Sequence, residues 1–327
     1  MKASSVPAKL SKRYVIGVDF GTLSARALLV EVDTGREVAS AVHDYADGVI
    51  ESHLPGEKKR LPPETALQDP ADYLTALSRT IPKVLRAARV NPEHVIGLGT
   101  DFTSCTVLPT KRDGTPLCLD RRWRKNPHAW VKLWKHHAAQ PQANAINAAG
   151  QARGETFIRA YGGRYSSEWF FSKLLETLQQ APEVYDAADR FLEAGDWIVW
   201  QLSGVERRNE CAAGYKGLWV KGLGYPNNDF LCALDPRLDQ FNETKINAPI
   251  VPPGTPIGKL TEQAAKWMGL RPGIAVAAAT IDAHAAVPGA GVTEPGRMVL
   301  ILGTWNSMTE LSKAMTSLTA PKAAWTS

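Results

Sequence analysis

Residues 14–26 read YVIGVDFGTLSAR, and this stretch decides the fold of the chain. Its first six residues are a β-rich run that ends in Asp19, and the next five place glycine beside small hydroxyl side chains, which suits a tight turn. A β-rich pattern resumes over residues 25–32, and a D-T-G turn leads into a third such run over residues 37–43. The sequence therefore predicts three antiparallel strands at the start of the protein.

Helical and extended patterns alternate after these strands. From Pro70 to Val90 apolar residues recur at helical spacing, and Asp69 stands where an N-cap is expected. Residues 95–100 and 274–279 are short apolar runs typical of buried strands. Strand, loop, helix and strand in this order predict an α/β architecture.

Further elements follow from the same patterns. A proline-rich connector covers residues 249–256, and a short helix over residues 261–268 begins at Thr261 and stops at Gly269. Residues 298–302 are expected to form a strand. The middle of the chain predicts four helices, over residues 127–139, 169–180, 182–188 and 197–202.

Composition narrows the class of protein. The chain has 327 residues, which suggests about two domains. Its hydrophobic content of 44% and charged content of 22% are ordinary for a globular protein and exclude collagen-like, fibrous and wholly disordered chains. The formal net charge of +5 is small for this length, and aromatic residues do not recur around the basic run at residues 121–125, so no nucleic-acid partner is expected.

Cysteine usage and hydropathy predict the compartment. The four cysteines are far apart and form no C-x-x-C pair, so neither a disulfide framework nor a thiolate zinc site is expected. Residues 1–13 are basic but lack the apolar run of a secretory signal. No stretch reaches the roughly 18 apolar residues of a membrane span. We therefore expect a soluble, cytoplasmic protein with no membrane partner.

Three segments share one design, in which a buried strand delivers a polar loop. They are residues 18–26, residues 281–286 and the triad Leu302-Gly303-Thr304. Glycine with Thr or Ser at a turn offers backbone N–H groups and hydroxyls to a polyphosphate. A carboxylate at a strand end can hold Mg²⁺ through water or accept a proton. Taken alone, D-F-G-T favours the simpler interpretation of a tight turn whose Asp bonds its own backbone.

The order of these segments carries more information than any one of them. D-x-G-T-x-S-x-R after an opening strand, then an Asp before small residues, then a strand ending in G-T, resembles the FGGY carbohydrate kinases. That family has an actin-like, ribonuclease H-like α/β fold with two domains around an ATP cleft. Four further runs resemble the branch that phosphorylates the terminal (5-) hydroxyl of L-ribulose in L-arabinose catabolism: residues 100–106, 133–138, 193–197 and 213–216.

The resemblance implies an enzyme, an ATP- and Mg²⁺-dependent sugar kinase whose partner is L-ribulose, and it is compatible with a homodimer. Asp282 falls where the family keeps its catalytic base, in contact with the sugar, and Asp19 suits water-mediated Mg²⁺. Ser104, Trp134 and Lys216 fall where the sugar pocket is lined. The ATP phosphates are assigned to the two G-T loops, that is, to Gly21, Thr22, Ser24, Arg26, Gly303 and Thr304.

Several of these side chains have simpler interpretations. Trp134 stands at helical spacing from Trp130 and could belong to the core, and Lys216, on an irregular segment, would ordinarily lie at the surface. The pair at residues 136–137 resembles a metal pair but lacks a third ligand, which favours a surface or sugar-facing pair of histidines. His284 is expected to pack locally or to bond substrate rather than zinc.

Three other functions remain open from the sequence. One is another FGGY kinase, for xylulose, D-ribulose or glycerol. The second is a non-catalytic, actin- or chaperone-like nucleotide-binding module, against which the Asp282 segment and the Trp134 and Lys216 pocket argue. The third is a degenerate or truncated paralogue.

The resemblance also divides the chain. It implies an N-terminal tail (residues 1–12), a domain with the sugar pocket, phosphate loop and base (residues 13–288), and the start of an ATP-binding domain (residues 289–327). Family members continue well past residue 327, and residues 306–327 do not follow their pattern. We therefore expect a fragment that ends inside its second domain and has weak or no turnover of ATP.

Overall fold

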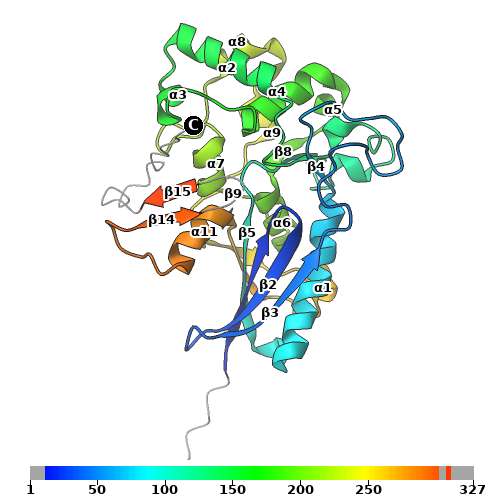
Figure 1. Cartoon of the computed structure of the whole chain (residues 1–327), viewed down its shortest axis with the longest axis vertical. Coiled ribbons are helices and arrows are strands. Elements are labelled where there is room, and N and C mark those ends of the chain that lie inside the picture. Colours follow the sequence, from blue (N-terminus) through cyan, green and yellow to red (C-terminus); the bar gives the residue numbers. More distant parts are fainter. Residues whose placement is uncertain (1–11, 302–306, 311–327) are drawn as a thin grey trace, which may run out of the picture.

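A seven-stranded mixed sheet fills the lower part of Figure 1, which shows the computed structural model. The structure describes residues 12–301 and 307–310. The strands lie in the order β11-β12-β5-β1-β2-β3, and β13 pairs with the end of β5. Strands β1 to β3 are antiparallel, whereas β5 runs parallel to β1, β12 and β13. The bounds are β1 (Tyr14–Phe20), β2 (Ser24–Glu31), β3 (Glu37–Asp44), β5 (Val95–Phe102), β11 (Pro256–Lys259), β12 (Ala275–Ala277) and β13 (Thr280–Ile281).

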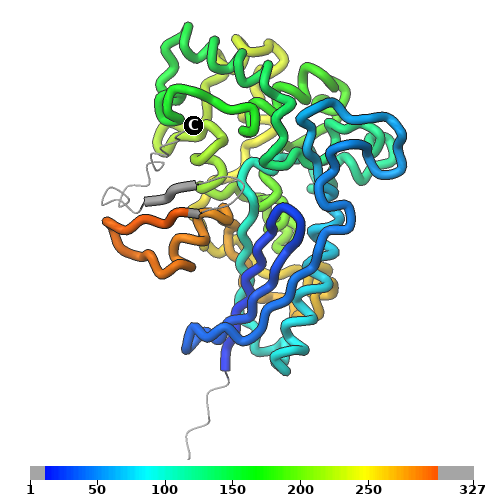
Figure 2. Tube along the Cα trace, viewed as in Figure 1, coloured from blue at the N-terminus to red at the C-terminus, as the bar shows by residue number. Residues whose placement is uncertain are grey.

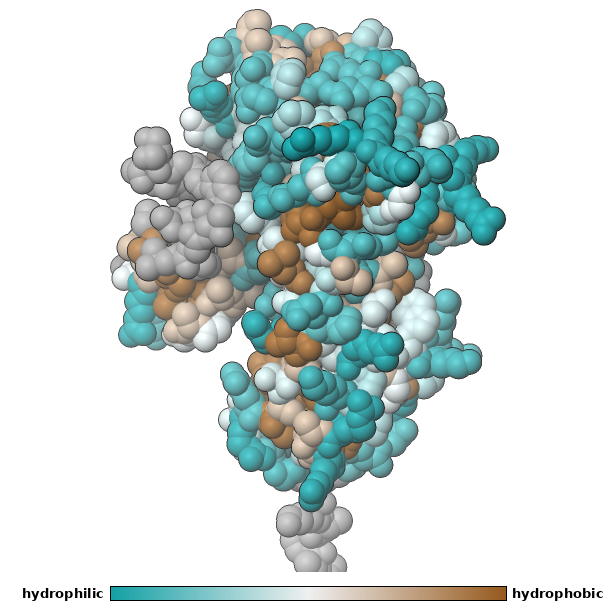
Figure 3. Space-filling view, turned by 45° about the vertical axis from the view of Figure 1, so that its right-hand side comes forward, coloured by the Kyte–Doolittle hydropathy of each residue, from teal (hydrophilic) through white to brown (hydrophobic). Residues whose placement is uncertain are grey.

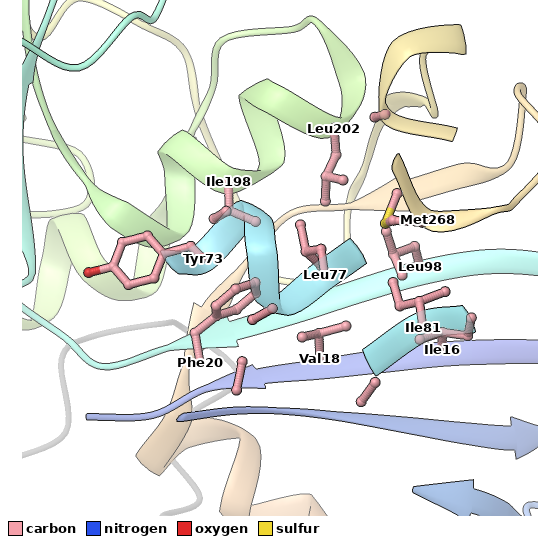
Figure 4. Packing of buried hydrophobic residues seen from close by; sticks show 14 of the residues in the cluster. Ile16, Val18, Phe20, Tyr73, Leu77, Ile81, Leu98, Ile198, Leu202 and Met268 are labelled. Carbon is pink, nitrogen blue, oxygen red and sulfur yellow. The ribbon is translucent and has the colours of Figure 1, made fainter. Parts of the chain in front are cut away.

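Three helices cover one face of this sheet: α1 (Pro70–Ala88), α6 (Ala194–Ser203) and α10 (Glu262–Met268). Alternate residues of β1 are buried, as expected for a strand with one face on the core. Figure 4 shows Val18 and Phe20 pointing toward Tyr73 and Leu77 of α1. Each such side chain contributes about 1.5–3 kcal/mol through its burial, so this face holds the large sheet and its three helices together.

A second core lies in the helical upper part of Figure 1. It surrounds a small antiparallel sheet of order β4-β7-β6-β8, made of β4 (Leu67–Gln68), β7 (Val131–Lys132), β6 (Val107–Thr110) and β8 (Arg190–Glu193). Helix α4 (Phe170–Gln180) runs through its centre and is buried over nearly its whole length. The other helices here are α2 (Gln140–Arg153), α3 (Thr156–Ala160), α5 (Pro182–Ala187), α7 (Glu210–Lys216), α8 (Asn228–Leu234) and α9 (Phe241–Lys245).

The remaining elements complete the chain. Strands β9 (Arg208–Asn209) and β10 (Ile250–Val251) pair in parallel, and α11 (Asp282–Gly289) precedes a hairpin of β14 (Met298–Ile301) and β15 (Ser307–Glu310). Because β13 pairs with β5 and β5 with β1, three segments far apart in the sequence lie side by side (Figure 2). Four 3₁₀ turns are η1 (Pro92–His94), η2 (Leu117–Leu119), η3 (Pro127–Ala129) and η4 (Pro236–Leu238).

Most predicted elements are confirmed. The three opening strands form, and α1 starts where Asp69 accepts a hydrogen bond from the Ala71 N–H at 2.8 Å. Helix α10 is capped by Thr261 and stops at Gly269, which adopts a left-handed backbone. The predicted helices near residues 169–180, 182–188 and 197–202 correspond to α4, α5 and α6.

The helix predicted over residues 127–139 is wrong. After the short turn η3, the chain forms β7, which pairs with β4 and β6. The apolar residues there follow one another without helical spacing, and strand partners distant in the sequence override local propensity. The strand predicted over residues 274–279 is also shorter, because β12 ends at Ala277 and β13 begins at Thr280.

The surface facing the reader in Figure 3 is mainly hydrophilic, with apolar residues gathered in patches across its middle. Among the residues that the structure describes, no helix has the length and apolar character to cross a membrane. The predicted domain boundaries at residues 12–13 and 288–289 stay a prediction.

Candidate active site

Three carboxylates meet at one edge of the large sheet. Asp19 near the end of β1 stands in register with Asp101 of β5, and Thr280 of β13 pairs with the same Asp101. Asp282 follows β13 directly as the first residue of α11. Carboxyl ends of parallel strands share an edge of the sheet, which is where α/β proteins assemble their binding sites.

Crowding of these acids changes their proton affinity. Burial, then the neighbouring carboxylates of Asp19 and Asp282, raise the pKa of Asp101 to about 8. Burial also raises the pKa of Asp282, although a hydrogen bond from the Ala283 N–H to Asp282 Oδ1 at 2.7 Å opposes this. A raised pKa makes a carboxylate a stronger base. Sequence reasoning singled out Asp19 and Asp282 but missed Asp101, although it ends a predicted strand in the same way.

The edge offers hard oxygen donors, which Mg²⁺ prefers. Oδ1 of Asp101 is buried and accepts no hydrogen bond from the described residues. Asp19 has a loose ion pair with Arg26, at 3.6 Å between Nη1 and Oδ2, with both side chains about half exposed. Residues 12–301 and 307–310 contain no group of three His, Cys, Asp or Glu side chains arranged to hold a metal directly. The half-exposed carboxylate of Asp19 is the oxygen donor at this edge whose chemistry fits Mg²⁺.

The turn between β1 and β2 is the predicted phosphate loop, residues 20–24. Its Gly21 N–H donates to the Ser24 carbonyl at 3.0 Å, and a Cβ at position 21 would lie only 3.3 Å from that oxygen. This contact is tighter than most Cβ contacts, so the close approach of the backbone favours glycine here. Gln68 Nε2 donates to the Thr22 carbonyl at 2.7 Å, and this contact holds the loop to the rest of the protein.

Trp134 links the predicted sugar pocket to this loop. Its Nε1–H donates to Thr22 Oγ1 at 3.0 Å, and its side chain is half-buried. The residue follows β7 and is not helical, so the alternative of a core tryptophan at helical spacing from Trp130 is wrong. One hydrogen bond therefore joins the segment that the resemblance assigns to the sugar and the segment that it assigns to the ATP phosphates.

Ser104 lies in the loop between β5 and β6, beside an unusual backbone position. The following residue, Cys105, has φ of 58°, in the left-handed region that residues with a Cβ rarely adopt. Thr106 N–H donates to Glu193 Oε2 at 3.1 Å, and the two hydroxyls of Thr103 and Thr106 are 2.8 Å apart. The loop is thus fixed by contacts on both sides of Ser104.

Lys216 is the last residue of α7 and is buried, so the interpretation of a surface lysine on an irregular segment is wrong. Its Nζ lies 5.1 Å from the centre of the Tyr215 ring, and Tyr165 Oη donates to its carbonyl at 2.7 Å. Burial alone would lower the pKa of Lys216, but nearby groups that include Glu168 and Glu193 raise it above its usual value. The side chain therefore stays cationic, and its charge acts on Asp282.

The run at residues 193–197 contacts both the loop that contains Ser104 and helix α7, which ends in Lys216. Glu193 bonds the Ser104 loop as described, and Asp196 Oδ1 accepts from both N–H groups of Asn209, the N-cap of α7, at 2.8 Å. Burial raises the pKa of Glu193 to about 8. Hydrogen bonds from this run therefore reach the run at residues 100–106 and the N-cap of the helix that carries residues 213–216.

Two of the three histidines considered from the sequence, His137 and His284, and the second G-T loop come next. His284 packs locally, edge-on against Tyr215 with ring centres 5.0 Å apart, as expected. The Nδ1 atom of His137 lies 3.5 Å from Ser167 Oγ. Gly303 and Thr304 lie outside the described residues.

His136 is buried, so the expected surface or sugar-facing pair of histidines is wrong for this residue. Its Nδ1 accepts from the Ala66 N–H at 3.2 Å, and its Nε2 lies 2.9 Å from Glu176 Oε2. Nδ1 therefore carries no proton. Burial lowers the pKa of His136 to about 4, although Glu176 opposes this.

This geometry predicts acid sensitivity. The unfolded chain protonates His136 below about pH 6.5, whereas the folded protein resists protonation until about pH 4, so stability falls as pH drops through this window. In His136→Gln, urea unfolding should show lower stability at pH 7 but a pH dependence flatter by about 1 kcal/mol per unit between pH 6.5 and 4. The matched control is His53→Gln at an exposed position. An equal slope in all three proteins would contradict the prediction.

Known proteins are similar to this chain over most of its length. A family model described as "FGGY family of carbohydrate kinases, N-terminal domain" matches residues 14–289. A ribulokinase of Geobacillus thermodenitrificans is 51% identical over 295 residues, which cover 90% of this chain and 52% of the relative. A ribulokinase of Mycolicibacterium smegmatis is 51% identical over 293 residues, covering 89% and 52%. The chain thus spans about half the length of these curated relatives.

Solved structures are similar to the fold. A gluconate kinase from Lactobacillus acidophilus superposes with a TM-score of 0.69 at 18% identity, covering 91% of this chain and 54% of that one. A ligand-bound xylulose kinase from the same organism gives a TM-score of 0.68 at 17% identity, covering 90% and 54%. At such identities the likeness shows the fold alone, and it confirms the predicted α/β, actin-like architecture.

Proposed function

Because the chain belongs to the FGGY family of carbohydrate kinases, we propose that it carries the sugar-binding half of a ribulokinase, which transfers the γ-phosphoryl group of ATP to the terminal hydroxyl of L-ribulose. The observation that carries the proposal is that Asp282 begins α11 at the edge where β1, β5 and β13 end, near the loop of residues 20–24, to which Trp134 donates a hydrogen bond. The similarity to ribulokinases at about 50% identity over nine-tenths of the chain supports the choice of sugar.

Asp282 acts as the base in this proposal. It takes the proton of the sugar's terminal hydroxyl as that oxygen attacks the γ-phosphoryl group, and its raised pKa suits the task. The cationic Lys216 donates to sugar hydroxyls, and the Trp134 ring covers a face of the sugar. Positioning and charge neutralisation supply most of the rate in such reactions.

The phosphates of ATP would lie against the β1–β2 turn. Gly21 lets the backbone approach closely, and Thr22, Ser24 and Arg26 supply hydroxyl and guanidinium donors. Mg²⁺, when bound through water near Asp19, neutralises charge on the phosphates. Gly303 and Thr304 are proposed as a second phosphate contact from the sequence alone. A cytoplasmic location and a homodimer also stay predictions.

Ligand-dependent stabilisation tests the proposal on this chain directly. L-Ribulose should raise the melting temperature in proportion to the logarithm of its concentration above the dissociation constant, because it binds only the folded state. D-Ribulose, xylulose and glycerol, tested in parallel, separate this reading from the other FGGY kinases. Stabilisation by ATP but by none of the four sugars and polyols would instead favour a non-catalytic nucleotide-binding module and overturn the proposal.

Pocket variants test the assignments of Trp134 and Lys216. Trp134→Ala should weaken L-ribulose binding by about 1–3 kcal/mol, because an aromatic face over the sugar is lost. Lys216→Ala should weaken it as well. Titration calorimetry with L-ribulose and with ATP measures both affinities. Trp267→Ala, at another half-buried tryptophan, on α10 and outside the segments assigned to the sugar, is the control. Equal losses for sugar and nucleotide would mean that the two residues support the fold rather than the pocket.

A further inference from the structure

Lys173 of α4 is a lysine that the chemistry above does not use. Its side chain is among the largest that are fully buried, with 1% of the residue exposed. The ammonium group donates to two main-chain carbonyls, Cys105 at 2.5 Å and Leu133 at 2.7 Å. These acceptors are 68 and 40 residues away in the sequence, so the contact ties together segments that meet only in the folded protein.

Each acceptor stands directly beside a proposed sugar-binding residue. Cys105 follows Ser104, and Leu133 precedes Trp134. Lys173 Nζ thus reaches the main chain of both segments that are assigned to the sugar, while its stem is buried. A charged donor gives hydrogen bonds roughly twice as strong as neutral ones.

The Cys105 acceptor depends on this donor. Cys105 has the left-handed backbone noted above, a conformation that persists only where its surroundings enforce it. Its carbonyl accepts from no other donor among the described residues. The Leu133 carbonyl, by contrast, also accepts from the His136 N–H at 2.9 Å. Loss of the ammonium would therefore release the Ser104 loop first.

We propose that Lys173 is a positioning residue of the sugar pocket, which fixes Ser104 and Trp134 relative to each other by donating to the main chain beside each. It acts through these two residues and does not touch the sugar. The inference rests on the proposed function for its effect on ligand affinity, but its effect on the backbone can be measured without any ligand.

The chain offers a matched control in Lys245 of α9. Its Nζ also bridges two main-chain carbonyls, Tyr185 at 3.1 Å and Ala188 at 2.5 Å, but these belong to α5 and the residue after it, away from the pocket segments. Lys173→Met and Lys245→Met therefore each remove an ammonium group that bridges two main-chain carbonyls, from a fully buried residue in the first case and a half-buried one in the second. Lys173→Gln, whose neutral amide can still donate, is the conservative variant.

Hydrogen–deuterium exchange and calorimetry with L-ribulose are applied to the four proteins. In the unaltered chain, residues 103–106 and 133–136 should exchange as slowly as α4. Lys173→Met should speed exchange in these two segments and weaken L-ribulose binding about tenfold or more, with Lys173→Gln intermediate. Lys245→Met should leave both quantities unchanged and speed exchange only near residues 185–189.

The outcomes separate the two hypotheses. Fast exchange of residues 103–106 in the unaltered chain would overturn the positioning role, even if Lys173→Met fails to fold. Unchanged exchange and affinity in a folded Lys173 variant would overturn it too, as would equal effects from Lys245→Met. If the unaltered chain does not bind L-ribulose, the proposed function fails, whereas local exchange still decides whether Lys173 fixes the two segments.

Discussion

Asp282→Asn should abolish nearly all phosphoryl transfer, with a loss of about 10²–10⁴-fold or more, typical of a removed general base. The amide has the shape of the carboxylate but cannot accept the proton of the attacking hydroxyl. Because Asp282 begins α11 at the edge of the sheet and its Oδ1 already accepts a backbone N–H, an isosteric change keeps its surroundings intact. L-Ribulose binding should therefore remain close to that of the unaltered protein.

Asp101→Asn is the matched comparison for this variant. The two acids lie at the same edge, but the carboxyl of Asp101, with its pKa raised to about 8 by burial and by Asp19, is protonated at neutral pH. An amide then replaces a neutral group, so only a several-fold change in rate is expected at pH 7. Because this chain spans half the length of its relatives, ribulose-dependent ADP release is measured in a chain that carries these residues and extends to their full length. Near-normal turnover by Asp282→Asn would eliminate it as the base.

The parts of the fold that sequence reasoning predicted correctly are those whose signals are local. The hairpins of β1 to β3 depend on turn residues within a few positions of each strand. The starts of α1 and α10 are marked in the sequence by their N-cap residues, Asp69 and Thr261. The prediction for the region of β7 was wrong because this strand pairs with β4 and β6. Strand β4 lies about 64 residues earlier in the chain, and the paired residue of β6 lies about 25 residues earlier. No local pattern records such partners.

The candidate site divides in the same way. Asp19 and Asp282 were predicted because strand-end acids followed by small residues are visible along the chain. Lys173 was not predicted, because its acceptors are main-chain carbonyls, which any residue type supplies and no sequence pattern marks. The burial of Lys216 could not be predicted either, since it depends on α7 being anchored by Asp196 through Asn209. Roles that act through the backbone emerge only when the fold is in hand.

The buried ion pair between Lys132 and Glu176 leads to the second large effect, on stability. Lys132 Nζ lies 2.5 Å from Glu176 Oε2, with the two side chains 4% and 3% exposed, and it also donates to Thr177 Oγ1 at 2.7 Å. Glu176→Gln should lower the free energy of unfolding by about 3–5 kcal/mol, because it leaves an uncompensated ammonium in the interior. Urea unfolding at pH 7 measures the loss. Asp33→Asn, which breaks the exposed Arg13–Asp33 pair at a similar 2.7 Å, should change stability little, since both side chains are about half in water.

The pH dependence of the same variant tests the cause. Burial lowers the pKa of Lys132 and Glu176 opposes this, so removal of the carboxylate should lower that pKa further. In Glu176→Gln the folded protein then binds fewer protons at Lys132 than the unfolded chain does, so stability relative to the unaltered protein should recover as pH rises toward about 10. The double variant Lys132→Met/Glu176→Leu removes both charges and should regain much of the loss, as apolar replacements of buried pairs often do. A deficit in Glu176→Gln that is independent of pH and undiminished in the double variant would point to lost packing around α4 rather than to the stranded charge.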